Sequence, residues 1–146
     1  MTTRSKNPLE TSATHLLHRA GQRAADIFAE EAKKGGLTPR QYAVLTAVSQ
    51  EEGLPQAELV ARTGIDRSTL ADIVARLLSR GLIQRRRAKE DGRAYAIKLS
   101  AKGTKALAKA KPAASAADAK LLAGLSATKR NEFMKTLSAV VAAGED

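Results

Sequence analysis

Cysteine is absent from the sequence, and histidine occurs only twice among its 146 residues. The lack of cysteine excludes disulfides, thiolate nucleophiles, thiol redox sensing and cysteine-based zinc sites. Two histidines leave few nitrogen ligands, so we expect no metal site and no cofactor. The chain also lacks a glycine-rich phosphate-binding motif and a legible set of nucleophile, base and orienting residue, which argues against an enzyme.

Long apolar runs are missing as well. No run approaches the roughly 18 residues needed to cross a bilayer, and no secretory signal precedes the fold. We therefore expect a cytoplasmic protein with no membrane partner. The length, together with 43% hydrophobic and 27% charged residues, fits one globular domain of ordinary size.

Basic residues are in excess and are unevenly distributed. The net charge is +10, and residues 54–99 have ten basic and five acidic side chains. Within that block, residues 82–99 alone have six basic and two acidic side chains. A local excess of positive charge makes nucleic acid, or another polyanion, the first partner to consider. A solvated hairpin kept soluble by its charge is the alternative for residues 82–99.

Two helices are predicted in the first third of the chain, after a mobile arm at residues 1–10. Apolar residues recur at helical spacing within residues 11–36, which indicates the first helix. The second begins at Thr38, where Gln41 three residues later completes a capping box, and it ends near Gly53.

Residues 55–81 predict a helix, a tight turn and a second helix. The first begins at Pro55 and ends at Gly64, the residue type best suited to the left-handed conformation after a helix. Asp66 then caps a second helix, which Gly81 terminates. Beside its aliphatic face, the second helix has an outward face of Arg67, Ser68, Ala71, Asp72, Ala75 and Arg76. Small and basic side chains on that face let a helix lie close to DNA.

A β-hairpin follows these helices. Residues 82–87 and 94–99 are short strand-like segments, and the second alternates larger apolar residues with small or polar ones. A turn-forming stretch that contains Asp91 and Gly92 lies between them. Residues 37–99 therefore predict a winged helix-turn-helix, in which one helix enters a major groove and a basic hairpin reaches a neighbouring minor groove.

Two further helices are predicted in the C-terminal part. Ser100 can cap the first, and Pro112 should kink or interrupt it, because proline removes a backbone hydrogen bond and clashes with the preceding turn. The last helix begins after Ser126 and has an apolar stripe of Phe133, Leu137, Val140 and Val141. Neither this stripe nor the one on the first helix has another obvious partner within the chain.

These elements, in this order, resemble the MarR family of bacterial transcription regulators over nearly the whole chain. The motifs that match are LTPRQY at 37–42, QAEL at 56–59, DRSTL at 66–70, GLIQRR at 81–86, EDGR at 90–93 and LSAKG at 99–103. The resemblance implies a mainly α fold, with a dimerisation helix at 11–36, a DNA-binding lobe at 37–99, and a linker helix and second dimerisation helix at 100–146. It further implies a homodimer on a near-palindromic operator in double-stranded DNA. Packing of the terminal helices within a monomer is the alternative.

The resemblance also assigns DNA-binding residues, beginning with a recognition helix whose start approaches bases and phosphates. Arg93 matches the wing-tip arginine that enters the minor groove, and Asp91 resembles the acid that orients a wing arginine. For Asp91 a plain turn residue is the alternative. The full DNA-binding set is Gln56, Arg67, Ser68, Thr69, Asp72, Arg76, Arg85, Arg86, Asp91 and Arg93.

Two positions depart from the family pattern. Asp72 lies where many relatives have a basic residue, and Gly92 replaces a frequent arginine at the wing tip. Asp72 would repel phosphate but could accept a hydrogen bond from a cytosine amino group, so the operator should not be copied from relatives. Gln56 could bond a phosphate or could only cap its helix.

Most members of the family repress transcription and release DNA when a small ligand binds between the dimerisation helices and the DNA-binding lobes. Residues 15–23 and the DRSTLAD stretch resemble members that respond to aromatic acids or their coenzyme A thioesters. The effector residues expected on this resemblance are His15, His18, Arg23, Arg40 and Tyr42. They would offer cations to a carboxylate or phosphate and an aromatic wall. Alternatively, the arginines are solvated, Tyr42 belongs to the core and the histidines lie in the dimer interface.

The rival function is a non-sequence-specific architectural DNA-binding protein that uses the Ala- and Lys-rich C-terminal half. It predicts uniform affinity across sequences and a steep salt dependence. A ligand-released repressor, the function that we expect, predicts one site bound about 10³–10⁷ times more tightly than bulk DNA.

Overall fold

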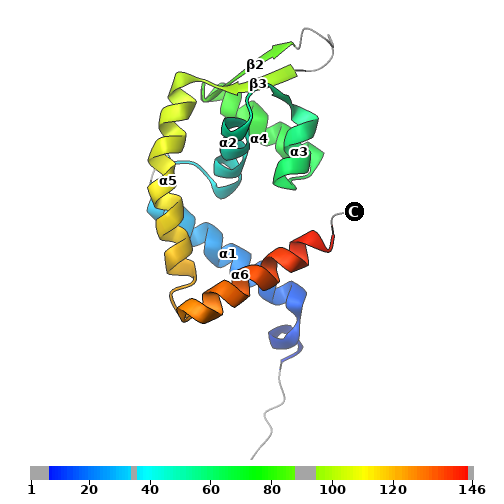
Figure 1. Ribbon diagram of the computed structural model, residues 1–146, viewed down its shortest axis with the longest axis vertical. Coiled ribbons are helices and arrows are strands. Elements are labelled where there is room, and N and C mark those ends of the chain that lie inside the picture. The colour runs from blue at the N-terminus through cyan, green and yellow to red at the C-terminus, as the bar shows by residue number, and fades with distance from the viewer. Residues whose placement is uncertain (1–6, 34–35, 88–94, 145–146) are drawn as a thin grey trace, which may run out of the picture.

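The computed structural model describes residues 7–33, 36–87 and 95–144, which form a winged helix-turn-helix between flanking helices (Figure 1). The elements are η1 (Pro8–Thr11), α1 (Ala13–Ala32), α2 (Pro39–Gln50), β1 (Leu54–Pro55), α3 (Gln56–Thr63), α4 (Arg67–Ser79), β2 (Ile83–Arg87), β3 (Tyr95–Leu99), α5 (Ala101–Leu121) and α6 (Ala127–Ala142). The predicted mainly α fold is confirmed. Residues 37–99, the winged-helix lobe, lie at one end of the molecule, α1 and α6 lie at the other, and α5 runs along both.

The helix boundaries follow the predicted capping residues. At α2 the Gln41 N–H donates to Thr38 Oγ1 and the Thr38 N–H donates to Gln41 Oε1, both at 3.1 Å, so the capping box is complete. Asp66 and Ser100 cap α4 and α5 with side-chain oxygens, as predicted. Gly64 adopts the left-handed conformation (φ 70°) at the end of α3, which fixes the tight turn before α4.

The wing contains one strand more than the predicted hairpin. The sheet order is β1-β3-β2, with both neighbouring pairs antiparallel. In the extra pair, Leu54 of β1 lies opposite Ile97 of β3. Pro55 ends β1 and precedes α3 rather than opening it, so the helix begins one residue later, at Gln56. Proline fits here because an edge strand leaves backbone N–H groups unpaired in any case.

A short 3-10 helix extends into the segment expected to be an arm. Asn7 caps this turn, because its side-chain oxygen accepts the Leu9 N–H at 3.0 Å. Residues 8–10 therefore belong to a regular turn that the sequence analysis did not predict. A single turn offers no apolar periodicity from which it could be recognised.

The sequence predicts a kink or an interruption at Pro112; the helix α5 is continuous through this residue, so an interruption is wrong. Ala110, before the proline, packs in the core of the winged-helix lobe, whereas Ala114 and Ala117, after it, pack against Phe28 of α1. The packing before and after Pro112 keeps the segment helical, although the proline cannot make one backbone hydrogen bond of the helix.

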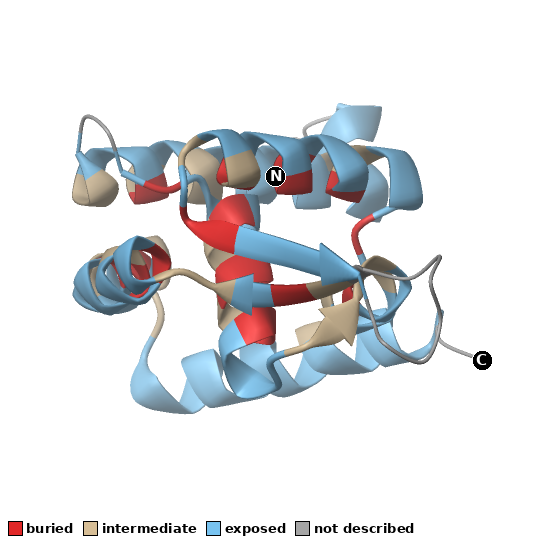
Figure 2. Ribbon diagram, turned by 90° about the horizontal axis from the view of Figure 1, so that it is seen from above, coloured by how far each residue is buried: buried red, intermediate tan, exposed pale blue. Residues whose placement is uncertain are grey.

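The winged-helix lobe has a hydrophobic core of its own, which the first half of α5 completes. Its largest fully buried side chains are Leu45, Leu59, Leu70, Leu77, Leu82, Ile97, Val44, Val48 and Val74. Figure 2 shows the buried start of β2 next to its exposed remainder, above buried helix segments. Burying each such side chain stabilises the fold by about 1.5–3 kcal/mol, so this core holds the lobe and the first half of α5 together.

The other end of the molecule is packed differently. None of the described residues of α6 is buried. Large apolar side chains remain exposed there and on the first half of α1: Leu16, Leu17, Phe133, Met134, Val140 and Val141. Among the described helices, none is long and apolar enough to cross a membrane. The helices α1 and α6 thus each expose large apolar side chains that the described residues of this chain leave uncovered.

Candidate nucleic-acid interface and ligand cavity

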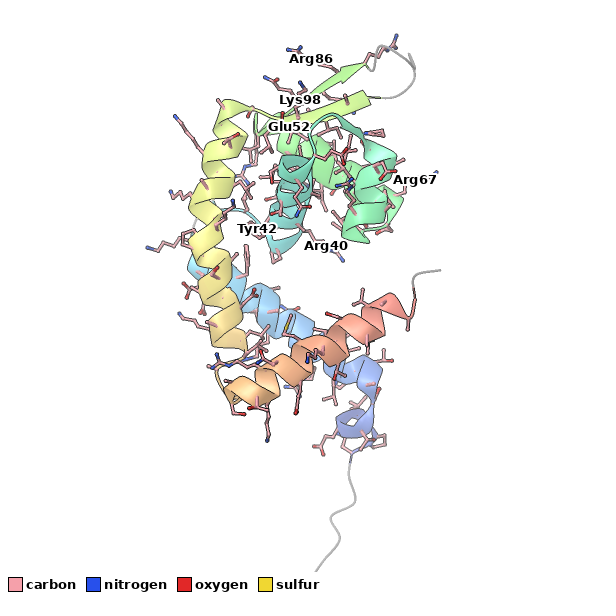
Figure 3. The ribbon with its side chains drawn as sticks, in the orientation of Figure 1. Arg40, Tyr42, Glu52, Arg67, Arg86 and Lys98 are labelled. Atoms are coloured by element: carbon pink, nitrogen blue, oxygen red, sulfur yellow. The ribbon has the colours of Figure 1, made fainter. Side chains whose placement is uncertain are left out.

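The first turn of α4 exposes a cation and a hydroxyl group. Arg67 and Ser68 are exposed, and Thr69 is half buried. Asp66 Oδ2 accepts the Thr69 backbone N–H at 3.2 Å, and the hydrogen bonds with Thr69, helped by the charge of Arg40, lower the pKa of the Asp66 carboxyl. This cap fixes the first turn and leaves Arg67 directed away from the lobe (Figure 3).

Further along α4, two exposed side chains form an ion pair. Arg76 Nε lies 3.2 Å from Asp72 Oδ2, and the two side chains are 70% and 66% exposed. Exposed pairs four residues apart on a helix contribute only about 0.3–0.5 kcal/mol. Either partner can therefore exchange the other for a competing ion at little cost.

The C-terminal end of α4 is fixed against α5. Ser100 Oγ donates to the Gly81 carbonyl at 2.6 Å, and the Ser100 N–H donates to the Leu82 carbonyl at 3.0 Å. Gly103 approaches Leu82, the residue before β2, so closely that a Cβ would lie 1.9 Å from the Leu82 oxygen. The end of α4, the base of the wing and the start of α5 are thus joined by direct backbone contacts.

The wing presents a run of cations. Residues 85–87 are three exposed arginines on β2, and Lys98 is exposed on β3. The register pairs Arg86 with Ala96, so by strand alternation Arg86 and Lys98 share the face opposite the buried Ile97. Figure 3 shows both side chains at the outer end of the lobe. The predicted wing-tip residues Asp91 and Arg93 lie outside the described residues.

Gln56 is the first residue of α3 and is half buried. The residue before it is Pro55, and in the described part of the chain no side-chain hydrogen bond caps this helix. The structure therefore gives no support to capping as the role of Gln56.

An open cavity of about 1100 Å³ lies between the winged-helix lobe and the helices α1 and α5. Its walls come from α1, the start of α2, one face of α4 and the second half of α5. Phe28 and Tyr42 line it with tilted rings whose centroids are 5.9 Å apart. Arg40 points from the underside of the lobe toward α1 and α6 in Figure 3.

The cavity offers charges of both signs beside its aromatic wall. The titratable or charged residues that line it are His18, Arg40, Tyr42, Asp72, Arg76 and Asp118. Arginine binds carboxylates through charge-assisted hydrogen bonds, and flat rings pack against aromatic side chains. An aromatic ring with a carboxylate group thus has the chemistry that these walls can bind.

Three of the five predicted effector residues line this cavity: His18, Arg40 and Tyr42. His15 and Arg23 do not occur among the described residues that line it. His15 is half buried near the start of α1, and Arg23 is exposed. The structure therefore brings together part of the predicted set.

The helix α4 contributes side chains to the cavity that were not predicted to line it: Thr69, Asp72, Ile73 and Arg76. Their i, i+3, i+4 and i+7 spacing shows that they share one helix face. That spacing could be seen in the sequence. Which distant helices would lie opposite this face could not, because it depends on the path of α5.

Known proteins with similar sequences and structures share this arrangement of elements. A family model described as MarR family matches residues 35–94. The chain is 33% identical over 127 residues to the Escherichia coli transcriptional regulator HosA, covering 87% of this chain and 93% of HosA.

Two solved structures are similar over most of their length. One is the transcriptional regulator PcaV of Streptomyces coelicolor in complex with its natural ligand, with a TM-score of 0.88, 31% identity, and coverage of 97% of this chain and 100% of that one. The other is Bordetella bronchiseptica BpsR, whose DNA binding is regulated by 6-hydroxynicotinic acid, with a TM-score of 0.81, 26% identity, and coverage of 88% of this chain and 97% of that one.

Proposed function

The chain belongs to the MarR family of transcriptional regulators, and on that premise we propose that it is a homodimeric repressor that a small aromatic acid, or its coenzyme A thioester, releases from its operator. One observation supports this proposal above the others. The helix α4 exposes Arg67 and Ser68 on one side and lines the cavity with Asp72 and Arg76 on another. A ligand in the cavity would therefore touch the helix that binds DNA.

The DNA-binding role is assigned to α4 and the wing. A helix about 10–12 Å wide fits the major groove, where side chains of its first turns reach base edges. We propose that Arg67, Ser68 and Thr69 act there and that the arginines of β2 approach the flanking phosphates. Arg93, which follows β2 in the sequence and lies outside the described residues, is proposed to enter the minor groove.

The dimer is assigned to the terminal helices, residues 11–36 and 100–146. Apolar side chains that stay exposed on α1 and α6 support this assignment, because burial of such a surface drives association. Two copies related by a two-fold axis would place matching α4 helices about 34 Å apart, on a near-palindromic operator. The named relatives are bacterial proteins, and we propose the bacterial cytoplasm as the place of action.

The effector is assigned to the cavity. Its size of about 1100 Å³ accommodates a small aromatic acid, and clefts that bind small molecules usually combine apolar walls with a few polar groups. We propose that Phe28 and Tyr42 pack against the ring and that Arg40 and Arg76 bind the acidic group. Regulation of BpsR by an aromatic acid supports this class of ligand.

A competition assay tests the proposal. Labelled DNA from upstream of the protein's own gene is bound by the purified chain, and unlabelled upstream or random duplex is added. We expect the upstream site to be preferred by about 10³-fold or more, and a panel of aromatic acids to contain one that releases it. Equal competition by both duplexes would instead identify an architectural DNA-binding protein.

A further inference from the structure

Three faces can be distinguished around α4, at 3.6 residues per turn. The face buried in the core has Leu70, Ile73, Val74 and Leu77. The outward face has Arg67, Ser68, Ala71 and Ala75, all exposed. Between them, Thr69, Asp72 and Arg76 line the cavity. Arg76 thus lies at the boundary of the outward face and the cavity, with a side chain long enough to reach either.

Among the described residues, the Arg76 side chain pairs with Asp72, one turn earlier on the same helix. Both side chains are largely exposed, so water competes for each of them. An arginine in a weak pair at the edge of a cavity is available to an anion that arrives from either side. A phosphate would approach from the outward face, and a ligand carboxylate would approach from the cavity.

From this geometry we propose that Arg76 is one cation shared by the two ligands. It binds a DNA phosphate when the outward face is on DNA, it binds the carboxylate of an aromatic acid when the cavity is filled, and it pairs with Asp72 when neither is present. The two ligands then exclude each other by direct competition for one guanidinium group. The inference rests on the proposed function and specifies how the same site is regulated.

Asp72 determines how tightly Arg76 can bind either anion. Its carboxylate must be displaced from Arg76 by either anion, and its negative charge repels both. Removing that charge should therefore strengthen both complexes, whereas removing the arginine should weaken both. A residue that acted in only one of the two sites would change only one affinity.

Neighbouring cations do not have this position. Arg67 lies on the outward face and is not among the described residues that line the cavity. Arg40 lines the cavity from α2, outside the helix that is assigned to the major groove. Among these three arginines, Arg76 alone both belongs to α4 and lines the cavity.

The test compares the full-length wild type with Arg76→Gln, Asp72→Asn and Lys111→Gln, the last being a charge control on the exposed side of α5. DNA affinity is measured by fluorescence anisotropy on the upstream fragment at several salt concentrations. Each measurement is repeated with saturating 6-hydroxynicotinate or benzoate, and with benzamide as the uncharged analogue. Acid affinity is measured separately by calorimetry.

For the wild type we expect an acid to weaken DNA binding by about tenfold or more, and benzamide to have no effect. Arg76→Gln should weaken DNA binding by about tenfold, lower the salt slope by about one, and weaken binding of the acid. The acid should then change its DNA affinity by less than about twofold. Asp72→Asn should bind both ligands more tightly than wild type, and Lys111→Gln should behave as wild type.

Two results would overturn the shared cation while leaving the proposed function intact. One is an Arg76→Gln protein whose DNA is still released by the acid as strongly as in wild type. The other is an Arg76→Gln protein that loses affinity for only one of the two ligands. A wild type that prefers no DNA sequence, or from which no acid of the aromatic-acid panel releases the DNA, would refute the proposed function and the inference together.

Discussion

The two ends of the molecule differ in how far they bury their apolar side chains. In the winged-helix lobe, side chains such as Leu45, Leu59 and Leu77 are completely buried by other parts of the same chain. At the opposite end, Val140 and Val141 of α6 remain 56% and 60% exposed, and Leu16 of α1 remains 49% exposed. The lobe, together with the first half of α5, therefore buries its own apolar side chains, whereas the terminal helices expose a surface that a second copy would cover in the dimer that we propose.

Because they bury their apolar side chains to different extents, the two ends are suited to different roles. A rigid lobe fixes the positions of α4 and the wing relative to each other, which reading a duplex requires. In the dimer that we propose, the terminal helices would determine how the two lobes are spaced, and α5 contacts both ends of each chain. The cavity lies where the two ends meet, so a ligand bound there can act on both.

The largest effect should come from breaking the apolar surface of α6. Leu137→Glu combined with Val141→Glu places two charges on that stripe, and we expect dimer dissociation to increase by at least about 100-fold, or about 2.8 kcal/mol. Sedimentation velocity at several concentrations measures this change. Lys135→Glu, on the opposite side of the same helix, is the matched control and should remain dimeric. Unchanged dimers in the double variant would remove α6 from the interface.

The winged-helix lobe should lose stability when an extra methyl group is forced into its packing, whereas a charge on its surface should have little effect. Gly103→Ala would place a methyl group against the Leu82 carbonyl oxygen, and we expect it to lower the free energy of unfolding by about 1–3 kcal/mol. Urea denaturation measures the loss. Gly21→Ala is the control, because nothing lies within 4 Å of its Cβ position and alanine favours helix by about 0.5–1 kcal/mol. Equal effects of the two variants would contradict the close contact.

A smaller effect is expected from the outward face of α4. Arg67→Ala should weaken operator binding by about tenfold, which is within the 1–3 kcal/mol typical of a base-contacting arginine, without changing the dimer. Anisotropy titrations with operator and random duplex separate two roles. Loss on the operator alone indicates base reading, whereas equal loss on both indicates a phosphate contact. An affinity that stays at the wild-type value would exclude Arg67 from the interface.

The smallest effect concerns the cap of α4. Hydrogen bonds from Thr69 lower the pKa of Asp66 from its ordinary value of 3.8, so the ionised cap stabilises the fold above that value and the benefit is lost as the pH falls through the lower folded pKa. Melting temperatures of wild type and Asp66→Ala should therefore differ at neutral pH and converge below about pH 4. For Asp66→Asn, which caps without titrating, the difference from alanine should stay constant. Failure of the wild type to converge would contradict the role assigned to this carboxylate.

Local chemistry explains why much of the fold could be predicted from the sequence. The Thr38–Gln41 capping box, the Asp66 cap and the left-handed Gly64 each depend on residues within four positions of one another. The motifs of the wing and of α4 resemble those of the family, and this resemblance implies the order of the elements.

Features that depend on distant contacts were not predictable in the same way. The strand β1 has two residues and exists because Leu54 pairs with Ile97, more than forty positions away. The continuity of α5 through Pro112 depends on packing against α1 and the lobe. For the same reason the cavity contains Asp72 and Arg76 but not His15 or Arg23. Residue types indicated the chemistry of the site, and tertiary packing decided which residues were part of it.

We propose that two identical chains present matching α4 helices to one operator. Sedimentation equilibrium of the purified protein, alone and with the upstream duplex, tests it most directly. We expect a dimer in the absence of DNA and two chains on each operator, with footprints one helical turn apart. A chain that stays monomeric at micromolar concentration, and binds the operator as single copies, would contradict it.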